Sequence, residues 1–274
     1  MFHGRRVEAN HTWGEALAYA AAPVDAWGRG AGRSSHRKPD GGGFHALAGM
    51  PQALEAMRDG WQPGRERIGQ FLGASVAGVR AERVQDYRMD VAGERPSVPL
   101  AVAGDPRCMF RRRREAPRSR PVVRIVVNVG AMWWVPADDL ARRGAAILAY
   151  ADSLEASGWT TANDTVWYAV ESGGHASLTW RVEVKPAGER FDVDRLSFAL
   201  VCPDFMRRVG FAVLEGCPDL RSMSGNYGVP TDLAADGAAV YFPAVKDGSP
   251  WKTVEAALAS ARKAISAARP EVLS

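Results

Sequence analysis

The chain has 274 residues, of which 46% are hydrophobic and 24% are charged, a composition typical of ordinary globular proteins. No apolar run approaches the roughly 18 residues that a membrane-spanning helix needs. The N-terminus lacks the apolar segment of a signal peptide. Three cysteines without CxxC spacing predict neither a disulfide framework nor a zinc site. These features predict a soluble cytoplasmic protein without a membrane partner.

Positive charge is concentrated in the N-terminal part of the chain. Residues 1–120 contain 20 Lys and Arg against 13 Asp and Glu, whereas residues 121–274 contain 15 against 18. Two arginine-rich clusters are candidates for contacts with nucleic-acid phosphates. The clusters span residues 29–38 and 111–120, and the candidate contact residues are Arg33, Arg37, Lys38, Arg111, Arg112, Arg113 and Arg114. Because no stacking aromatic or known reader motif accompanies them, a solvated linker is the favoured interpretation and nucleic-acid binding the alternative.

The first predicted element is a short helix over residues 12–22. Thr12 is a good N-cap, and Glu15 follows three positions later, as in a capping box. Residues 27–43 are rich in Gly, Ser and charge, which favours a flexible basic linker. We therefore expect residues 1–43 to consist of a helix and a linker.

The next region, residues 44–120, is predicted to be smaller and mainly helical. A helix is expected over residues 49–61, with Pro51 near its start and Gly60 at its end. Apolar spacing in residues 65–91 favours one or two further helices. Three prolines between residues 92 and 109 then favour extended segments and turns. The region ends in the second arginine cluster.

Residues 121–274 alternate strands and helices, which predicts an α/β layered sheet. Residues 122–129 form a β-branched run of the kind buried on both faces of a sheet. A long helix over 136–158 and a strand over 164–172 follow. Further expected elements are a half-exposed antiparallel edge strand, a helix interrupted at Pro203, a strand and a terminal helix, over residues 176–186, 192–215, 238–245 and 250–268.

This order resembles a von Willebrand factor A-like fold, a Rossmann-like layered sheet with an antiparallel edge strand. The phrases EAMRDGW, AGDPRCM and VVRIVVNVGA, together with FDVDRLSFAL, also resemble an uncharacterised family of bacteriophage and prophage proteins. That resemblance covers most of residues 44–245. It implies a location in the host cytoplasm or in the virion, and it carries no known function.

The end of the first predicted strand is a candidate metal position. Metal-binding von Willebrand A domains place Asp-x-Ser-x-Ser there, since hard cations prefer clustered carboxylate and hydroxyl oxygens. Residues 128–132 read Asn-Val-Gly-Ala-Met, so only Asn128 offers a side-chain oxygen. We expect a degenerate ligand position that holds neither metal nor cofactor, with Gly130 allowing the loop to turn.

Trp133 and Trp134 leave the same strand at its carboxyl end, where α/β sheets usually bind ligands and partners. Together with Asn128, Gly130 and Tyr227 they form the candidate partner surface. Since consecutive side chains of a strand point to opposite faces, we expect one tryptophan to be buried and the other exposed. The alternative is that both tryptophans belong to the core.

The sequence contains no recognisable catalytic constellation. Its five histidines are scattered, and neither GxSxG nor HExxH occurs. The acidic pairs Asp138-Asp139 and Asp192-Asp194 lie where helices are predicted to begin, and carboxylates favour that end of the helix dipole. The leading hypothesis is a non-enzymatic, phage-encoded binding or assembly protein, either a virion component or an adaptor for an AAA+ ATPase. Nucleic-acid binding through the arginines is the second hypothesis, and a metal-dependent enzyme is the third.

Overall fold

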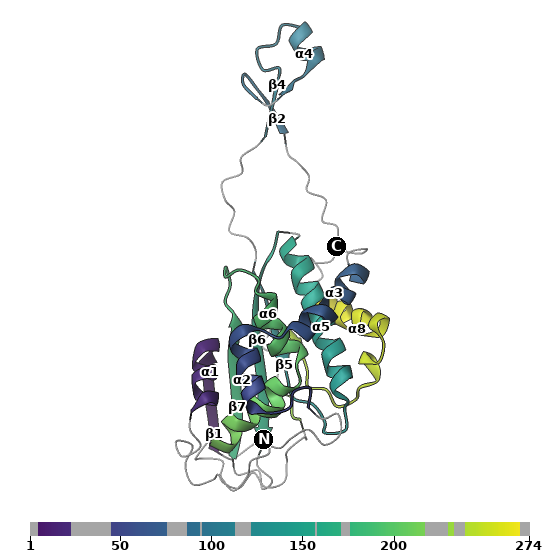
Figure 1. The fold of residues 1–274 in the computed structure, drawn as a ribbon. Coiled ribbons are helices and arrows are strands. Elements are labelled where there is room, and N and C mark those ends of the chain that lie inside the picture. Colours follow the sequence, from purple (N-terminus) through teal and green to yellow (C-terminus); the bar gives the residue numbers. More distant parts are fainter. Residues whose placement is uncertain are drawn as a thin grey trace. The chain divides into compact units, whose positions relative to one another are not determined.

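The structure, a computed structural model, describes residues 5–22, 45–75, 87–93, 95–112, 122–156, 158–170, 176–216, 230–232 and 239–268 (Figure 1). The chain divides into two compact units. The larger unit combines Met1–Val79 with Val122–Ser274, and the smaller unit is Arg80–Pro121. This division differs from the segments expected from the sequence, because the helices before residue 79 pack with the α/β elements.

A five-stranded mixed sheet, ordered β1-β7-β6-β5-β8, is the centre of the larger unit. Strands β5 (Val122–Asn128), β6 (Thr160–Val170) and β8 (Ala239–Phe242) are parallel, whereas β7 (Ala176–Lys185) is antiparallel to β6. The predicted α/β class is therefore confirmed. Strand β5 lies between two parallel neighbours, as its apolar β-branched run indicates.

Strand β7 is not the half-exposed edge strand that the sequence predicts. Strand β1 (Arg5–Thr12), which the sequence analysis missed, pairs in parallel with β7 and occupies the edge of the sheet. It reads RRVEANHT and lacks the large apolar residues by which strands are recognised. Trp180 and Val182 of β7 are buried, and the Trp180 ring stacks on Phe205 with centroids 5.4 Å apart.

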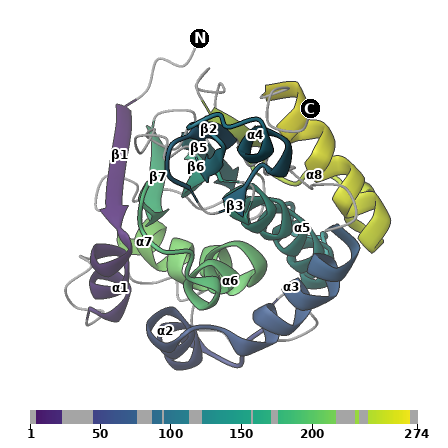
Figure 2. The ribbon, with the colours of Figure 1, turned by 90° about the horizontal axis from the view of Figure 1, so that it is seen from above.

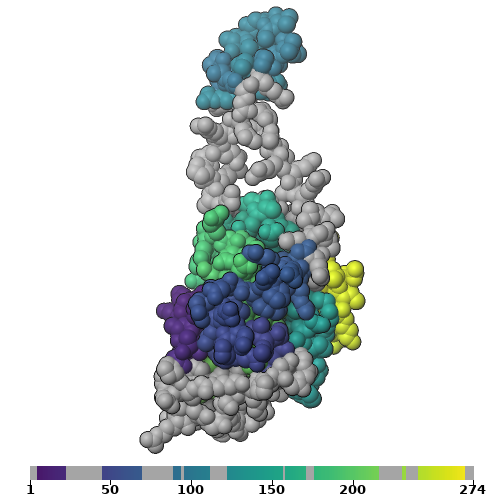
Figure 3. Space-filling model, viewed as in Figure 1, coloured from purple at the N-terminus to yellow at the C-terminus, as the bar shows by residue number. Residues whose placement is uncertain are grey.

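The helices of the larger unit correspond to those expected. They are α1 (Trp13–Ala21), α2 (Met50–Asp59), α3 (Gln62–Ser75), α5 (Ala137–Ala156), α6 (Val193–Val201), α7 (Phe211–Gly216) and α8 (Val254–Ala268). Figure 2 shows α2, α3, α5, α6 and α7 on one side of the sheet. In the space-filling view α2 and α3 lie side by side over this face (Figure 3). No helix in the described part of the chain is both long and apolar enough to cross a membrane.

Local signals explain where these helices begin and end. At α1 the capping box is present, with the Glu15 backbone N–H donating to Thr12 Oγ1 over 3.3 Å and the Thr12 N–H donating to Glu15 Oε2 over 2.8 Å. Helix α5 ends before Gly158, whose φ of +94° suits glycine. Near Pro203 the predicted interruption is confirmed, because a π-helix, η3 (Phe205–Gly210), follows between α6 and α7. A short 3₁₀ turn, η5 (Ser249–Trp251), precedes α8.

The smaller unit is built on a three-stranded antiparallel sheet ordered β2-β4-β3. Its strands are β2 (Tyr87–Asp90), β3 (Arg95–Pro96) and β4 (Met109–Arg112), and a short helix α4 (Val98–Val102) follows β3. The expectation of a mainly helical region is thus wrong for these residues. The apolar pattern of residues 65–91 predicts helix up to residue 91. Residues 87–90 instead form a strand that pairs with β4.

Candidate partner-binding site

Residues 129–136, here called the tryptophan loop, follow β5 at its carboxyl end. Asn128, the last residue of β5, is fully buried. Its Nδ2 donates to the Thr231 carbonyl over 3.0 Å and to the Tyr241 hydroxyl over 3.2 Å, and its Oδ1 accepts from the Gly130 N–H over 2.9 Å. The amide therefore positions the loop. Among the described residues, no group of three His, Cys, Asp or Glu side chains is placed to hold a metal ion.

Gly130 packs tightly against its neighbours and does not make an unusual turn. Its φ is not positive, which corrects the expected reason for a glycine here. A Cβ at this position would lie 3.0 Å from Asn128 Oδ1 and 3.2 Å from Trp167 Cδ1. Asn128 and Gly130 are both buried, so they support the candidate surface from inside the protein.

The tryptophan loop is fixed at several points along its backbone. The Val245 N–H donates to the Gly130 carbonyl over 2.9 Å, and the Met132 N–H donates to the Val245 carbonyl over 2.9 Å. The Val135 N–H closes a turn on the Met132 carbonyl over 3.0 Å. Arg207 Nη2 then donates to the Val135 carbonyl over 3.0 Å. These bonds join the loop backbone to Val245 and to the π-helix.

Arg143 of α5 fixes the base of the loop from inside the protein. Its Nη1 donates to the Asn128 carbonyl over 3.1 Å and its Nη2 to the Pro243 carbonyl over 2.7 Å. The guanidinium also lies over the Trp251 ring, 5.6 Å from the centroid. Burial lowers the pKa of Arg143 to about 10, so the side chain stays charged at neutral pH and joins the ends of β5 and β8.

Replacing Arg143 with lysine is expected to lower the free energy of unfolding by about 2 kcal/mol, measured by urea denaturation. The single ammonium of lysine cannot donate to the Asn128 and Pro243 carbonyls as the two Nη groups of arginine do. The control is Arg67→Lys, because Arg67 forms a solvent-exposed ion pair with Asp138 and its loss costs less than about 1 kcal/mol. Equal losses in the two variants would contradict the role of the fork.

Both tryptophans of the loop are exposed, Trp133 by 62% and Trp134 by 53%. Their rings contact each other edge to face, with centroids 5.5 Å apart. The expectation that one would be buried is wrong. The two residues lie in a turn and not in an extended strand, so the alternation of strand side chains does not apply to them.

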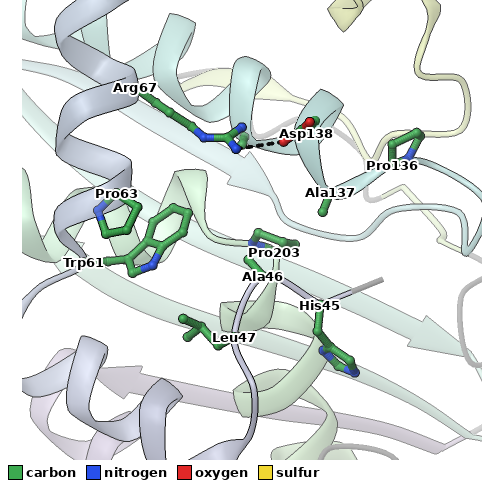
Figure 4. A pocket seen from close by; sticks show the side chains of 11 residues that line it. His45, Ala46, Leu47, Trp61, Pro63, Arg67, Pro136, Ala137, Asp138 and Pro203 are labelled. Carbon is green, nitrogen blue, oxygen red and sulfur yellow. Dashed lines mark ion pairs between the residues drawn. The ribbon is translucent and has the colours of Figure 1, made fainter. Parts of the chain in front are cut away.

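A pocket of about 470 Å³ adjoins the tryptophan loop. Its walls are mainly apolar, and its rim carries the ion pair between Arg67 and Asp138, whose atoms are 2.8 Å apart (Figure 4). Pro136, the last residue of the loop, contributes to the wall, as do Leu47, Trp61, Pro63, Ala141 and Pro203. Because Pro136 follows Trp134 by two residues, the Cα atoms of these two residues are at most about 7 Å apart.

One wall of the pocket is held by the carboxylate of Asp204, which is completely buried. Oδ1 lies 2.6 Å from His45 Nδ1 and 2.8 Å from Arg208 Nε. Oδ2 accepts from the Ala46 and Leu47 N–H groups over 2.6 and 2.8 Å. Arg208 Nη2 also donates to the Leu47 carbonyl over 2.6 Å. The segment 45–47 is thereby attached to the π-helix.

Cys202 lies beside this carboxylate, with its Sγ 3.9 Å from Asp204 Oδ2. Burial, reinforced by the charge of Asp204, raises the pKa of the Cys202 thiol well above its usual range. The thiol is therefore protonated at neutral pH and is a poor nucleophile.

The sequence analysis missed the two arginines that organise the site. Arg207 and Arg208 are consecutive residues of the π-helix, and both are completely buried. Arg207 fixes the tryptophan loop at Val135, and Arg208 fixes the pocket wall at Leu47. The spacing of Asp204 and Arg208 was visible in the sequence. Such pairs are usually found on exposed helix faces, so their burial could not be inferred.

Several predicted site residues lie outside the described residues. These are Arg33, Arg37, Lys38, Arg113, Arg114 and Tyr227. Arg111 and Arg112 belong to β4 of the smaller unit, and Arg111 Nη1 lies 3.2 Å from Asp90 Oδ2. The acidic pairs do begin helices: the Asp192 side chain caps α6, and Asp138 and Asp139 lie in the first turn of α5.

The fold and the loop together define an α/β protein with a mixed sheet and a fixed, tryptophan-bearing loop at the carboxyl end of a central strand. The chain belongs to the family described as domain of unknown function (DUF7192), whose model matches residues 9–263. No curated protein and no solved structure matches this chain.

Proposed function

We propose that this protein is a non-enzymatic binding or assembly protein that contacts a protein partner through Trp133, Trp134 and the adjoining pocket. The observation that carries the proposal is the exposure of two adjacent tryptophans on a loop whose backbone is held at Gly130, Met132 and Val135. Tryptophan is enriched among residues that dominate binding energy. A loop that is already ordered loses little conformational entropy on binding.

The type of assembly follows from the resemblances. Three parallel strands with a long helix after β5 are compatible with a von Willebrand A-like relationship, and the position of the metal-binding motif is occupied by an amide that bonds to the protein. The similarity of several phrases to phage and prophage proteins supports a phage origin. These features support two versions, a virion component and an adaptor for an AAA+ ATPase, by fold analogy.

Replacing Trp133 and Trp134 together with alanine is expected to weaken partner binding at least thirtyfold while changing the thermal midpoint little. The exposed indoles support the interface and not the core. The partner is first captured by tagged wild-type protein from phage-infected cells and identified, and its affinity is then measured with purified components. Val122→Ala, at another exposed apolar position of the larger unit, is the control and should bind normally.

A double variant that folds and binds the purified partner with wild-type affinity would contradict the proposed surface. A variant that unfolds would show that the tryptophans support the core. The two versions of the assembly are separated by fractionation. Recovery of the protein in purified particles supports the virion component, whereas recovery with an ATPase and not with particles supports the adaptor.

A further inference from the structure

The smaller unit is rich in arginine and carries exposed apolar residues. Residues 80–121 contain eleven arginines and six acidic residues. Wherever the structure gives exposure within 87–112, no residue is buried, and Val91, Val98 and Val102 are strongly exposed. The net positive charge of the smaller unit favours a negatively charged ligand.

The register of the three strands sorts their residues onto two faces. Phe110 of β4 lies opposite Met89 of β2 on one side and opposite Arg95 of β3 on the other. Residues that pair directly share a face, and residues two apart along a strand share it too. The Phe110 face therefore carries the positions Tyr87, Met89, Arg95, Phe110 and Arg112.

The opposite face has a different composition. It carries the positions Arg88, Asp90, Pro96, Met109 and Arg111. Arg111 pairs there with Asp90, with Nη1 and Oδ2 3.2 Å apart. The Phe110 face thus combines two aromatic and two arginine positions without an acidic one, whereas the Arg111 face includes a carboxylate that offsets its charge. This juxtaposition is invisible along the sequence, where Tyr87 and Arg112 are far apart.

We infer that the Phe110 face of the β2-β4-β3 sheet binds single-stranded nucleic acid. Aromatic side chains on an open sheet stack with unpaired bases, and neighbouring guanidinium groups bind the phosphates between them. Tyr87 and Phe110 hold diagonal positions on the neighbouring strands β2 and β4, a relation that places strand residues about 7–8 Å apart. Bases of a duplex are already stacked in the helix, so the face should prefer single strands.

The test measures binding of the full chain to a fluorescent single-stranded oligonucleotide of about 20 nucleotides and to a duplex of the same length. Anisotropy is recorded at several salt concentrations between about 50 and 200 mM. We expect the single strand to bind more tightly than the duplex, with affinity falling steeply as salt rises. Absence of binding at the lowest salt concentration would overturn the inference.

Variants on the two faces provide the matched comparison. Phe110→Leu retains an apolar side chain but removes the aromatic ring, and it should weaken single-strand binding about tenfold. Arg112→Gln should weaken binding and reduce the salt slope by about one, whereas its neighbour Arg111→Gln should leave both nearly unchanged. Circular dichroism and limited proteolysis establish that each variant is folded. If Phe110→Leu disturbs the unit, Phe110→Trp, which retains the aromatic ring, should bind at least as well as wild type.

Three results would contradict the stacking face. One is equal loss in the Arg111 and Arg112 variants, which would show that only total charge matters. Another is an unchanged affinity for Phe110→Leu in a folded protein. The third is displacement of the oligonucleotide by polyglutamate as effectively as by unlabelled single strand, which would indicate an acidic protein partner. None of these outcomes bears on the tryptophan loop, since it belongs to the other unit.

Discussion

Replacing Asp204 with alanine is expected to lower the free energy of unfolding by about 3–5 kcal/mol, measured by urea denaturation. The carboxylate is fully buried and accepts hydrogen bonds from the Ala46 and Leu47 backbone. It is also the acidic partner of Arg208, whose side chain is equally buried. Alanine would remove a buried charge that pairs with this guanidinium and the acceptor of two backbone amides.

Two further aspartate variants serve as comparisons for Asp204→Ala. Asp204→Asn keeps the size and one acceptor, so its loss should be smaller than that of alanine but still exceed about 1 kcal/mol. Asp138→Ala removes the exposed ion pair with Arg67 and a carboxylate in the first turn of α5, and it should cost about 1 kcal/mol. Comparable losses for Asp204→Ala and Asp138→Ala would show that the buried network does not hold the pocket wall.

Replacing Gly144 with alanine is expected to destabilise the protein by about 3 kcal/mol, although alanine is normally the better helix former. Gly144 lies in α5 where that helix contacts α6. A Cβ there would be 2.8 Å from Val201 Cα and still closer to the Leu200 carbonyl. These are backbone atoms, so relief requires the two helices to separate.

The matched control is Gly69→Ala in α3, where a Cβ would meet nothing within 4 Å. This change should raise the free energy of unfolding by roughly 0.5–1 kcal/mol, because the unfolded chain loses freedom and the helix gains a favourable residue. Opposite shifts of the thermal midpoint are therefore expected. A gain in stability for Gly144→Ala would contradict the close approach of α5 and α6.

These variants also bear on the proposed binding site. Gly144 is buried in α5, so its effect on partner binding should follow from its effect on folding, whereas Asp204 also holds one wall of the proposed pocket. The tryptophan variants should behave in the opposite way, losing affinity without losing stability. Measuring both quantities for each variant distinguishes residues that make the surface from residues that support it.

Much of the larger unit was predictable from local patterns. The β-branched run of β5 and the long apolar stripe of α5 define their elements without reference to other parts of the chain. The capping box of α1 and the prolines near residues 203 and 250 mark helix boundaries for steric and hydrogen-bonding reasons that act locally. Strand β1 was missed because its residues are polar or small, and pairing with β7 makes it a strand.

The candidate sites were also predictable only in part from the sequence. The sequence by itself identified the paired tryptophans, the absence of carboxylate and hydroxyl ligands at residues 128–132, and the arginine-rich segment, because each depends only on which residues are adjacent. Only the tertiary structure decided that both tryptophans are exposed, that Arg207 and Arg208 are buried, and that Phe110 shares a face with Arg112 and not with Arg111. Burial and strand register depend on contacts between residues far apart in the chain. The composition and residue spacing of a single segment do not reveal those contacts.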